Sequence, residues 1–277
     1  MERYCGEFGY DLALHLPFLY WLHRRGRLTA TASVAGTREL YYFSPDHTVL
    51  PGERSFQKAP GANPDFSRAR FDLTEWCPPP YKDRFAGDPE ALAMCRDPAK
   101  PLLIVHNKHT REWDGPPVNF LGLPLLADLL SLLAPSHTIV YIRPGGLHTE
   151  SLASCACAGY TGDHNDAVEF GDHALLRQRF PDVHIFQDLL AASAHDYNGL
   201  QLRLHAECDR FVSVQGGNAV MASYFGGTNL VYAVRGPEVR YGTFQTLYPR
   251  LSGCTVVQVG APSEMLREAA KRFTTRA

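Results

Sequence analysis

The sequence predicts an α/β fold, with a parallel sheet of the Rossmann type in the C-terminal half and a smaller α/β unit in the N-terminal half. From about residue 101 to the end, short apolar runs alternate with helical patterns, as in sheets that carry helices on both faces. The first hundred residues hold fewer such patterns, and their second half is rich in Pro, Gly, Arg and Asp. A chain of 277 residues has room for one large domain or two small ones, and the change of pattern favours two. We therefore expect domains at residues 1–100 and 101–277.

The C-terminal half contains six apolar runs of strand length, each followed by a polar segment or a helical pattern. The expected strands cover residues 102–106, 138–142, 183–186, 210–214, 229–232 and 255–259. The expected helices cover residues 123–133, 173–180, 200–208, 219–225 and 263–273. Parallel sheets bind ligands at the carboxyl ends of their strands, so the residues just after each strand are the first candidates for a site.

The N-terminal half contains one clear helical pattern. Leucines recur at helical spacing within residues 11–25, where Pro17 indicates a kink or a late start. Strand patterns cover residues 29–34 and 39–43. Residues 44–100 lack periodicity, and we expect an irregular segment with a few short helices. A stretch of this length without regular structure is usually functional.

Composition narrows the class of protein. The formal net charge is -2, so no overall positive field attracts nucleic acid or an anionic membrane. The seven cysteines form no CxxC pair and match no zinc pattern, which favours reduced thiols in a cytosolic protein without a metal site. The sequence shows no signal-peptide layout and no apolar stretch long enough to span a bilayer. We therefore expect a cytoplasmic protein with no transmembrane segment.

The clearest ligand-binding pattern is the turn that follows the expected strand at residues 210–214. There Gln215, Gly216, Gly217 and Asn218 lead directly into a helix. Glycines let the backbone approach an anion, helix N-termini attract negative charge, and Asn is a common helix cap. The turn therefore indicates a diphosphate site, or else a tight strand–helix connection with no ligand. It is not the GxGxxG motif, so the dinucleotide fingerprint is absent.

Three other groups follow expected strands. Asn107 and Lys108 open a polar loop after residues 102–106, in which Lys108 or Arg111 is suited to neutralise phosphate. Arg143 follows the next strand and is a candidate for a phosphate or ribose contact, or for a surface ion pair. Glu238 follows the fifth strand, where a carboxylate can hold ribose hydroxyls or cap a turn. The candidate donor-binding residues in these groups, if the ligand is a nucleotide, are Asn107, Lys108, Arg143 and Glu238.

Five segments outside residues 44–100 together resemble a known family. They are Gly6–Tyr10 with the helical Leu16–Leu22, Asn107–Phe120, Val140–Pro144, Ser213–Asn218 and Ser223–Gly227. These segments resemble small GT-B-like glycosyltransferases, including enzymes of large algal DNA viruses that build capsid glycans, such as xylosyl- or fucosyltransferases. The resemblance implies a nucleotide-sugar donor on the C-terminal half, with UDP-sugar favoured over GDP-sugar, and an oligosaccharide acceptor on the N-terminal half. It also implies transfer without a metal cofactor.

Glycosyl transfer needs a base near the acceptor hydroxyl. Glu7, Asp46, His47 and Glu112 are the candidates, because each is a carboxylate or imidazole in a turn or loop that adjoins an expected element. The hypothesis is that the donor diphosphate lies on the glycine turn and that one of these groups deprotonates the acceptor in an inverting reaction. A retaining reaction stays open at this level, because the sequence gives no geometry.

Three alternatives stay open at the level of sequence. A polysaccharide pyruvyl transferase would use phosphoenolpyruvate on a similar scaffold and would have no affinity for nucleotides. A non-catalytic glycan-binding module would need only exposed aromatic side chains. An NAD-dependent oxidoreductase is disfavoured because the dinucleotide motif is absent.

Overall fold

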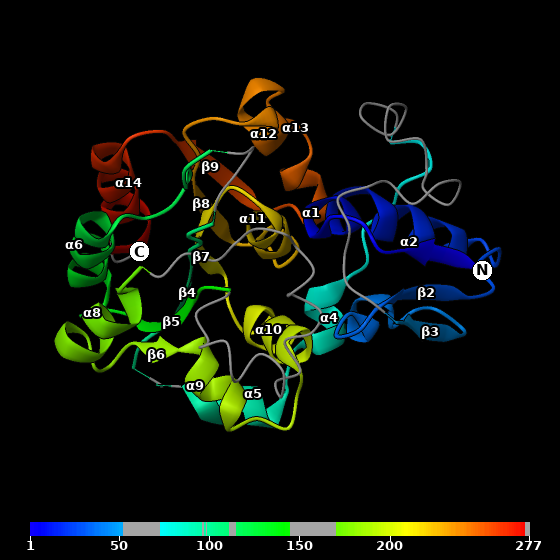
Figure 1. Ribbon diagram of the computed structural model, residues 1–277, viewed down its shortest axis with the longest axis horizontal. Helices are drawn as coiled ribbons and strands as arrows, with labels where there is room; N and C mark the ends of the chain where they lie inside the picture. The colour runs from blue at the N-terminus through cyan, green and yellow to red at the C-terminus, as the bar shows by residue number, and fades with distance from the viewer. Residues whose placement is uncertain (52–72, 96, 98, 111–114, 145–169, 275–277) are drawn as a thin grey trace.

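The chain folds into two lobes, each built on a parallel sheet (Figure 1). The computed structural model describes residues 1–51, 73–95, 97, 99–110, 115–144 and 170–274. In the N-terminal lobe, the sheet order is β1-β2-β3, with strands β1 (Glu2–Tyr4), β2 (Thr31–Val34) and β3 (His47–Leu50). In the C-terminal lobe, the strands are β4 (Leu102–His106), β5 (Thr138–Ile142), β6 (His184–Ile185), β7 (Arg210–Val214), β8 (Thr228–Tyr232) and β9 (Thr255–Val259). The predicted fold class is confirmed.

The six strands of the C-terminal lobe lie in the order β6-β5-β4-β7-β8-β9, and all neighbouring pairs are parallel. Counted along the chain, this is the order 3-2-1-4-5-6 of a Rossmann sheet. The chain reverses direction across the sheet between β4 and β7, so the crevice above the carboxyl ends of these two strands is where this fold binds ligands. The predicted bounds of β4, β5, β7 and β9 are confirmed without change.

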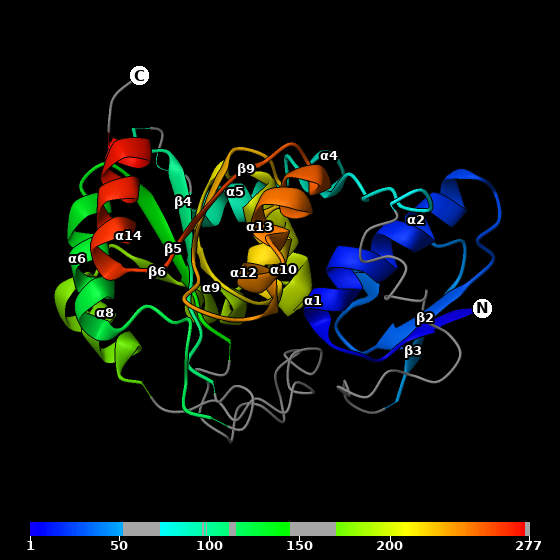
Figure 2. The same ribbon diagram turned by 90° about the horizontal axis from the view of Figure 1, so that it is seen from above.

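Helices cover both faces of this sheet (Figure 2). The helical elements of the C-terminal lobe are α6 (Leu123–Leu133), α8 (Asp172–Arg179), α9 (Phe186–Ala191), α10 (Tyr197–Ala206), α11 (Gly217–Ala222), α12 (Pro237–Arg240), α13 (Thr243–Thr246), η4 (Tyr248–Leu251), α14 (Pro262–Ala269) and η5 (Ala270–Thr274). Leu103 and Val105 of β4 pack in the core on the α6–α14 side, whereas Ile104 between them packs in the core on the α10–α11 side. This alternation is the reason that the buried strands read as continuous apolar runs.

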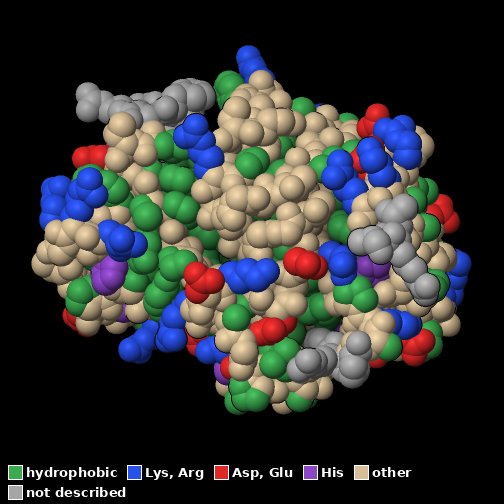
Figure 3. Space-filling view, turned by 180° about the vertical axis from the view of Figure 1, so that it is seen from behind, with side chains coloured by type: hydrophobic (Ala, Val, Ile, Leu, Met, Phe, Trp, Pro, Cys, Tyr) green, Lys and Arg blue, Asp and Glu red, His purple; other side chains and the backbone are tan. Residues whose placement is uncertain are grey.

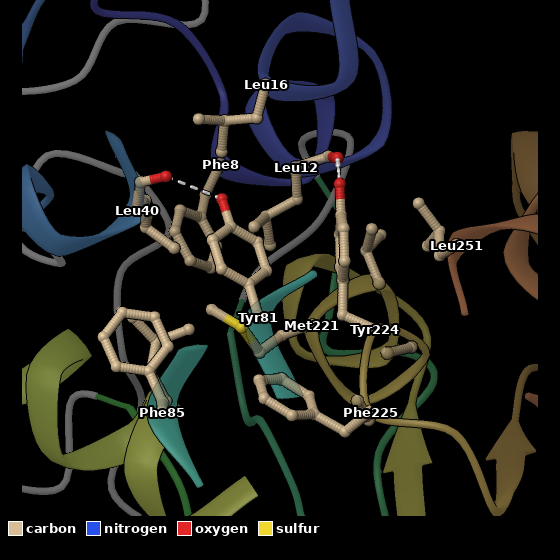
Figure 4. Close-up of a cluster of buried hydrophobic side chains, with 14 of the residues drawn as sticks. Phe8, Leu12, Leu16, Leu40, Tyr81, Phe85, Met221, Tyr224, Phe225 and Leu251 are labelled. Atoms are coloured by element: carbon tan, nitrogen blue, oxygen red, sulfur yellow. Dashed lines mark hydrogen bonds between the residues drawn. The ribbon is translucent and has the colours of Figure 1, made fainter. Parts of the chain in front are cut away.

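The core on the α10–α11 side continues into the N-terminal lobe. Phe8, Leu12 and Leu16 lie in the same buried cluster as Met221 and Tyr224 (Figure 4). The two lobes are therefore joined by an apolar core as well as by the chain. None of the described helices has the length and apolarity that a bilayer crossing requires.

A continuous helical segment runs from Phe8 to Arg24 in the N-terminal lobe and consists of α1 (Phe8–Tyr10), the π-helical η1 (Asp11–His15) and α2 (Leu16–Arg24). Pro17 lies inside this segment and has no N–H to donate to the preceding turn. Two carbonyl groups of that turn accept hydrogen bonds from side chains instead. The Trp76 indole donates to the Ala13 carbonyl at 3.0 Å, and the Tyr224 hydroxyl donates to the Leu12 carbonyl at 2.5 Å. The π-helical turn thus accommodates the proline that the sequence predicted to disturb the helix.

The strand predicted at residues 39–43 is wrong. These residues fall largely within a 3-10 helix, η2 (Arg38–Tyr41), and the third strand of the sheet is β3 instead. Burial explains the difference. Leu40 and Tyr41 enter the core together, and the Tyr41 hydroxyl donates to the buried Asp11 carboxylate at 2.7 Å.

Two short helices, α4 (Tyr81–Phe85) and α5 (Pro89–Cys95), fall in the segment predicted to be irregular with a few short helices. The ring of Tyr81 lies 4.9 Å from the ring of Tyr224, centroid to centroid, so α4 packs on the C-terminal lobe. A domain boundary at residue 100 stays a prediction.

Ion pairs also link the lobes. Arg203 of α10 donates to Glu39 of η2 at 2.5 Å and to Asp88 at 3.0 Å. Figure 3 shows the rear face of the molecule, on which acidic and basic side chains lie next to one another between the lobes.

Candidate functional site

The residues that follow β4 and β7 lie where the fold places a ligand. Asn107 and Lys108 follow β4, and Gln215, Gly216 and Gly217 follow β7. Gly216 has a φ of +132°, a conformation that side chains rarely adopt, and a Cβ there would lie 3.5 Å from the Lys108 Nζ. The structure therefore brings together Lys108 and the glycine turn, two parts of the site that the sequence predicted separately.

Glu7 of the N-terminal lobe lies across from the same turn. A Cβ on Gly217 would lie 2.6 Å from a ring carbon of Phe8 and 3.4 Å from the backbone nitrogen of Gly9. The Glu7 carboxylate accepts hydrogen bonds from the backbone N–H groups of Gly9 and Tyr10, each at 2.8 Å, and so begins α1. The absence of a side chain at Gly217 thus lets the Glu7 turn approach the β7–α11 turn closely.

Asn107 holds the loop after β4 in place. Its side chain is buried, its amide oxygen accepts from the N–H groups of Lys108 and Leu121 at 2.9 Å each, and its amide nitrogen donates to the Leu121 carbonyl and the Tyr141 hydroxyl. These contacts use both donors and both acceptor positions of the amide. Asn107 therefore positions the backbone from which Lys108 extends.

A second amide network joins the loops after β7 and β8. Asn119, at a φ of +52°, accepts from the N–H groups of Val234 and Arg235 and donates to the side-chain oxygen of Gln215 at 3.3 Å. Gln215 donates in turn to the Glu238 carboxylate. A Cβ on Gly236 would lie 2.0 Å from the Gln215 amide nitrogen, so the network depends on a glycine there. Asn119 and Arg235 also line an open cavity of about 520 Å³ beside α6 and α14.

Arg143 has a protein partner. Its guanidinium makes two hydrogen bonds to the Asp172 carboxylate, at 2.5 and 2.7 Å, and both side chains are buried. Burial alone would raise the pKa of Asp172, but the hydrogen bonds and charge of Arg143 outweigh it and hold that pKa below its usual value. The ion pair that the sequence offered as the alternative role of Arg143 is therefore present, and it is buried instead of lying at the surface.

Asn218 does not cap α11. The cap position is Gly216, and the Asn218 side chain points into the protein, where its oxygen accepts from Gln201 at 3.3 Å. The predicted cap is wrong because burial of the first turn of α11 draws the amide toward α10.

The other candidate bases lie elsewhere. His47 begins β3, and Asp46 precedes it, so both lie at the opposite edge of the small sheet from the carboxyl end of β1, which leads to Glu7. Both ring nitrogens of His47 are hydrogen-bonded, to Thr31 at 2.7 Å and to Ser33 at 3.2 Å. Burial, followed by the charge of Arg38, lowers the pKa of His47.

Some predicted features lie outside the described residues. Arg111 and Glu112 are among them. Within the part of the chain that the structure describes, no group of three or more His, Cys, Asp or Glu is arranged to hold a metal ion.

Sequence reasoning missed several residues that shape the site. Phe8 meets Gly217 only through the approach of the two lobes, and Asn119 is distinguished by a positive φ, which the sequence does not reveal. The third residue that the sequence did not indicate is Tyr248, which is buried in the apolar cluster that joins the two lobes. Burial, followed by the charges of Glu238, Glu7 and Tyr10, raises its pKa well above the ordinary value.

No protein-family model and no curated protein matches the sequence. Among solved structures, the chain is similar to the E. coli ADP-heptose LPS heptosyltransferase II, with a TM-score of 0.57 and 10% identity over 99% of both chains. It is less similar to the E. coli heptosyltransferase WaaC with ADP, with a TM-score of 0.38 and 15% identity over 88% of this chain and 64% of that one. A glycosyl transferase family 9 structure from Veillonella parvula gives a TM-score of 0.36 and 10% identity over 95% of this chain and 70% of that one.

The first of these similarities extends over the whole chain and establishes its fold. The protein has a two-lobed, GT-B-like α/β fold with a parallel sheet in each lobe.

Proposed function

We propose that this protein is a glycosyltransferase that moves a sugar from a nucleotide-sugar donor to a glycan acceptor. The observation that carries the proposal is the meeting of Lys108, the Gly216–Gly217 turn and the Glu7 turn at the switch point of a GT-B fold. A cation beside a glycine turn on one lobe suits a diphosphate, and a carboxylate on the facing lobe suits a base.

In the proposed reaction, the donor diphosphate binds beside Lys108, whose charge stabilises the departing nucleoside diphosphate. Glu7 accepts the proton of an acceptor hydroxyl, and the hydroxyl oxygen attacks the anomeric carbon from the side opposite the leaving group. The anomeric configuration is then inverted. Glu7 is favoured over Asp46 and His47 because only Glu7 lies at the carboxyl edge of its sheet and against the glycine turn.

The finer features of the proposal rest on the sequence resemblance. They are a UDP-linked donor, a sugar of the xylose or fucose type, and catalysis without a metal ion. The Gln215–Glu238 pair is proposed to contact the ribose, because Glu238 is only partly buried and lies at the carboxyl edge of the sheet. Arg143 is not assigned a donor contact in this proposal, because Asp172 already pairs with its charge.

The test is a thermal-shift panel with UDP, GDP, CMP, ADP, UDP-xylose, UDP-glucose, GDP-fucose, NADH and phosphoenolpyruvate. A ligand at a hundredfold excess over its dissociation constant stabilises the folded state by about 2.7 kcal/mol. We expect a shift with one nucleoside diphosphate and its sugar, unchanged by EDTA. If no nucleotide at millimolar concentration shifts the melting temperature, the proposal is refuted. A shift with phosphoenolpyruvate alone would identify a pyruvyl transferase instead.

Two variants test the assigned roles. Lys108→Met is expected to weaken nucleotide diphosphate binding at least tenfold, whereas Lys100→Met, at the other end of β4, is expected to leave it unchanged. Glu7→Gln is expected to keep donor binding and lose at least a hundredfold in transfer rate, in line with the usual contribution of a general base. Glu2→Gln on β1 is its control. Equal activity of Glu7→Gln and wild type would show that another group is the base.

A further inference from the structure

A second cavity lies where the two lobes meet, on residues that the proposed transfer reaction does not use. Its volume is about 540 Å³, a size typical of sites that bind small molecules. It is lined by residues of η2 and by Tyr42 in the N-terminal lobe, by residues of α4 and the loop that follows it, and by Arg203 of α10 in the C-terminal lobe. Figures 1 and 2 both show α4 between the two lobes. We refer to this cavity as the junction cavity.

The charged side chains of the junction cavity are three arginines and two carboxylates, namely Arg38, Arg84, Arg203, Glu39 and Asp88. Both carboxylates pair with the same arginine. Arg203 donates to Glu39 at 2.5 Å and to Asp88 at 3.0 Å. The carboxylates therefore have partners, and the cavity keeps an excess of positive charge.

Arg84 is held in place by aromatic rings instead of by a carboxylate. Its guanidinium carbon lies 5.5 Å from the centre of the Tyr42 ring and 5.7 Å from the centre of the Phe85 ring. The guanidinium carbon of Arg203 lies 5.3 Å from the centre of the same Phe85 ring, so two cations converge on one side chain. A guanidinium that packs on a ring keeps its N–H groups for other acceptors. Among the described residues, the Arg84 side chain has no hydrogen-bond or ion-pair partner.

Arg38 is the third cation of the junction cavity. Its side chain is exposed, and within the described part of the chain no carboxylate pairs with it. Glu39, the acidic residue next to it in η2, is already bound by Arg203. Two guanidinium groups without carboxylate partners and a third that is paired thus line one cavity, although like charges repel each other in the absence of a counterion.

This arrangement suits a phosphate group. Arginine presents its N–H groups in a planar fork that matches the spacing of phosphate oxygens, and hydrogen bonds between charged groups are about twice as strong as those between neutral ones. A nucleic acid fits less well, because the two carboxylates of the lining and a formal net charge of -2 oppose a long polyanion. The volume and the mixed lining of the cavity favour a small anion instead.

We propose that the junction cavity binds a phosphate group, either as the free ion or as part of a small phosphate monoester, with Arg38 and Arg84 as its ligands. Arg203 contributes positive charge and pairs with the two carboxylates that otherwise repel the anion. Because the lining comes from both lobes, the bound anion stabilises their association. None of the lining residues is assigned to donor binding or to catalysis, so the proposal does not depend on glycosyl transfer.

The test is calorimetric titration with inorganic phosphate, glucose 6-phosphate and glucose at constant ionic strength. The proteins compared are wild type, Arg38→Met, Arg84→Met and the double variant of both arginines. Arg179→Met is the matched control, because Arg179 is also exposed and lies 5.4 Å from the centre of the Phe180 ring, but belongs to α8 and does not line the cavity. Lys108→Met detects phosphate that binds at the candidate donor site instead. Circular dichroism establishes that each variant folds.

We expect wild type to bind at least one of the two phosphate compounds at millimolar concentration and not to bind glucose. Each single arginine variant should bind at least tenfold more weakly, because it loses charge-assisted hydrogen bonds, and the double variant should not bind. Arg179→Met and Lys108→Met should keep the binding of wild type. Tighter binding of glucose 6-phosphate than of inorganic phosphate would identify a phosphate monoester as the ligand, and equal or weaker binding would identify the free ion.

Three results overturn the proposal. They are the absence of phosphate binding by wild type, binding that the double arginine variant retains, and binding that Lys108→Met abolishes, because the phosphate then occupies the candidate donor site. The nucleotide panel tests glycosyl transfer separately. Phosphate binding that depends on Arg38 and Arg84 supports the junction cavity even if no nucleotide binds to the protein.

Discussion

Acid is expected to destabilise this protein through histidines that are buried in their neutral form. His15 lies in η1 with no exposed surface, its ring stacks on Tyr4 at 4.7 Å between centroids, and neither ring nitrogen has a hydrogen-bond partner among the described residues. Burial lowers its pKa to about 3. His205 is also buried, and burial lowers its pKa to about 3 against the opposing effect of a hydrogen bond to the Gln201 carbonyl.

The magnitude follows from the difference between the folded and unfolded states. A histidine in the unfolded chain has a pKa of about 6.5. Below that pH the histidine binds a proton in the unfolded state but stays neutral in the folded state. The contribution of each neutral histidine to the free energy of unfolding is fully present above pH 6.5 and is lost as the pH falls toward 3. At pH 5 the loss is about 2 kcal/mol for each residue, at about 1.4 kcal/mol per pH unit. Two such residues remove a large part of a typical stability of about 5–15 kcal/mol.

The assay is urea denaturation at pH 7.5 and pH 5, followed by tryptophan fluorescence. His15→Phe keeps a ring of similar size on Tyr4 and removes one titrating group. We expect this variant to lose about 2 kcal/mol less than wild type between the two pH values. His23→Phe, on α2 and partly exposed, is the control that should follow wild type. An equal loss in His15→Phe and wild type would refute the argument.

Three further predictions concern packing and are measured by the same denaturation assay. Tyr224→Phe removes the hydroxyl that donates to the Leu12 carbonyl and should lower the free energy of unfolding by about 1–3 kcal/mol. Gly217→Ala forces a Cβ against an aromatic ring and should cost about 1–3 kcal/mol, whereas Gly122→Ala, where a Cβ would make only ordinary contacts at 3.9 Å or more, should cost less than about 1 kcal/mol. Asp172→Asn breaks a buried ion pair and should cost about 3–5 kcal/mol, whereas Asp188→Asn in an exposed pair should cost less than about 1 kcal/mol. Equal losses within either matched pair would contradict the assignment.

The sequence by itself determined most of the C-terminal sheet. The runs at residues 102–106, 138–142, 210–214 and 255–259 are apolar and short, and each lies between polar segments or helical patterns, which allows one assignment only. The alternation of strands and helices then fixed parallel pairing, and parallel pairing fixed the edge at which Lys108 and Gly216 lie. Local patterns were sufficient for β4, β5 and β7 because both faces of these strands are buried by helices, whereas β9, at the edge of the sheet, is only partly buried.

Only the tertiary structure decided what happens where distant segments meet. Residues 39–43 resemble a strand locally, but burial of Leu40 and Tyr41 against the N-terminal helix makes most of them a 3-10 helix. The charge of Arg143 was visible in the sequence, whereas its neutralisation by Asp172 was not. Glu7 was one candidate base among four, and the contact of Phe8 with Gly217 placed it against the glycine turn. Such contacts depend on how two lobes approach each other, and no periodicity within either lobe encodes that distance.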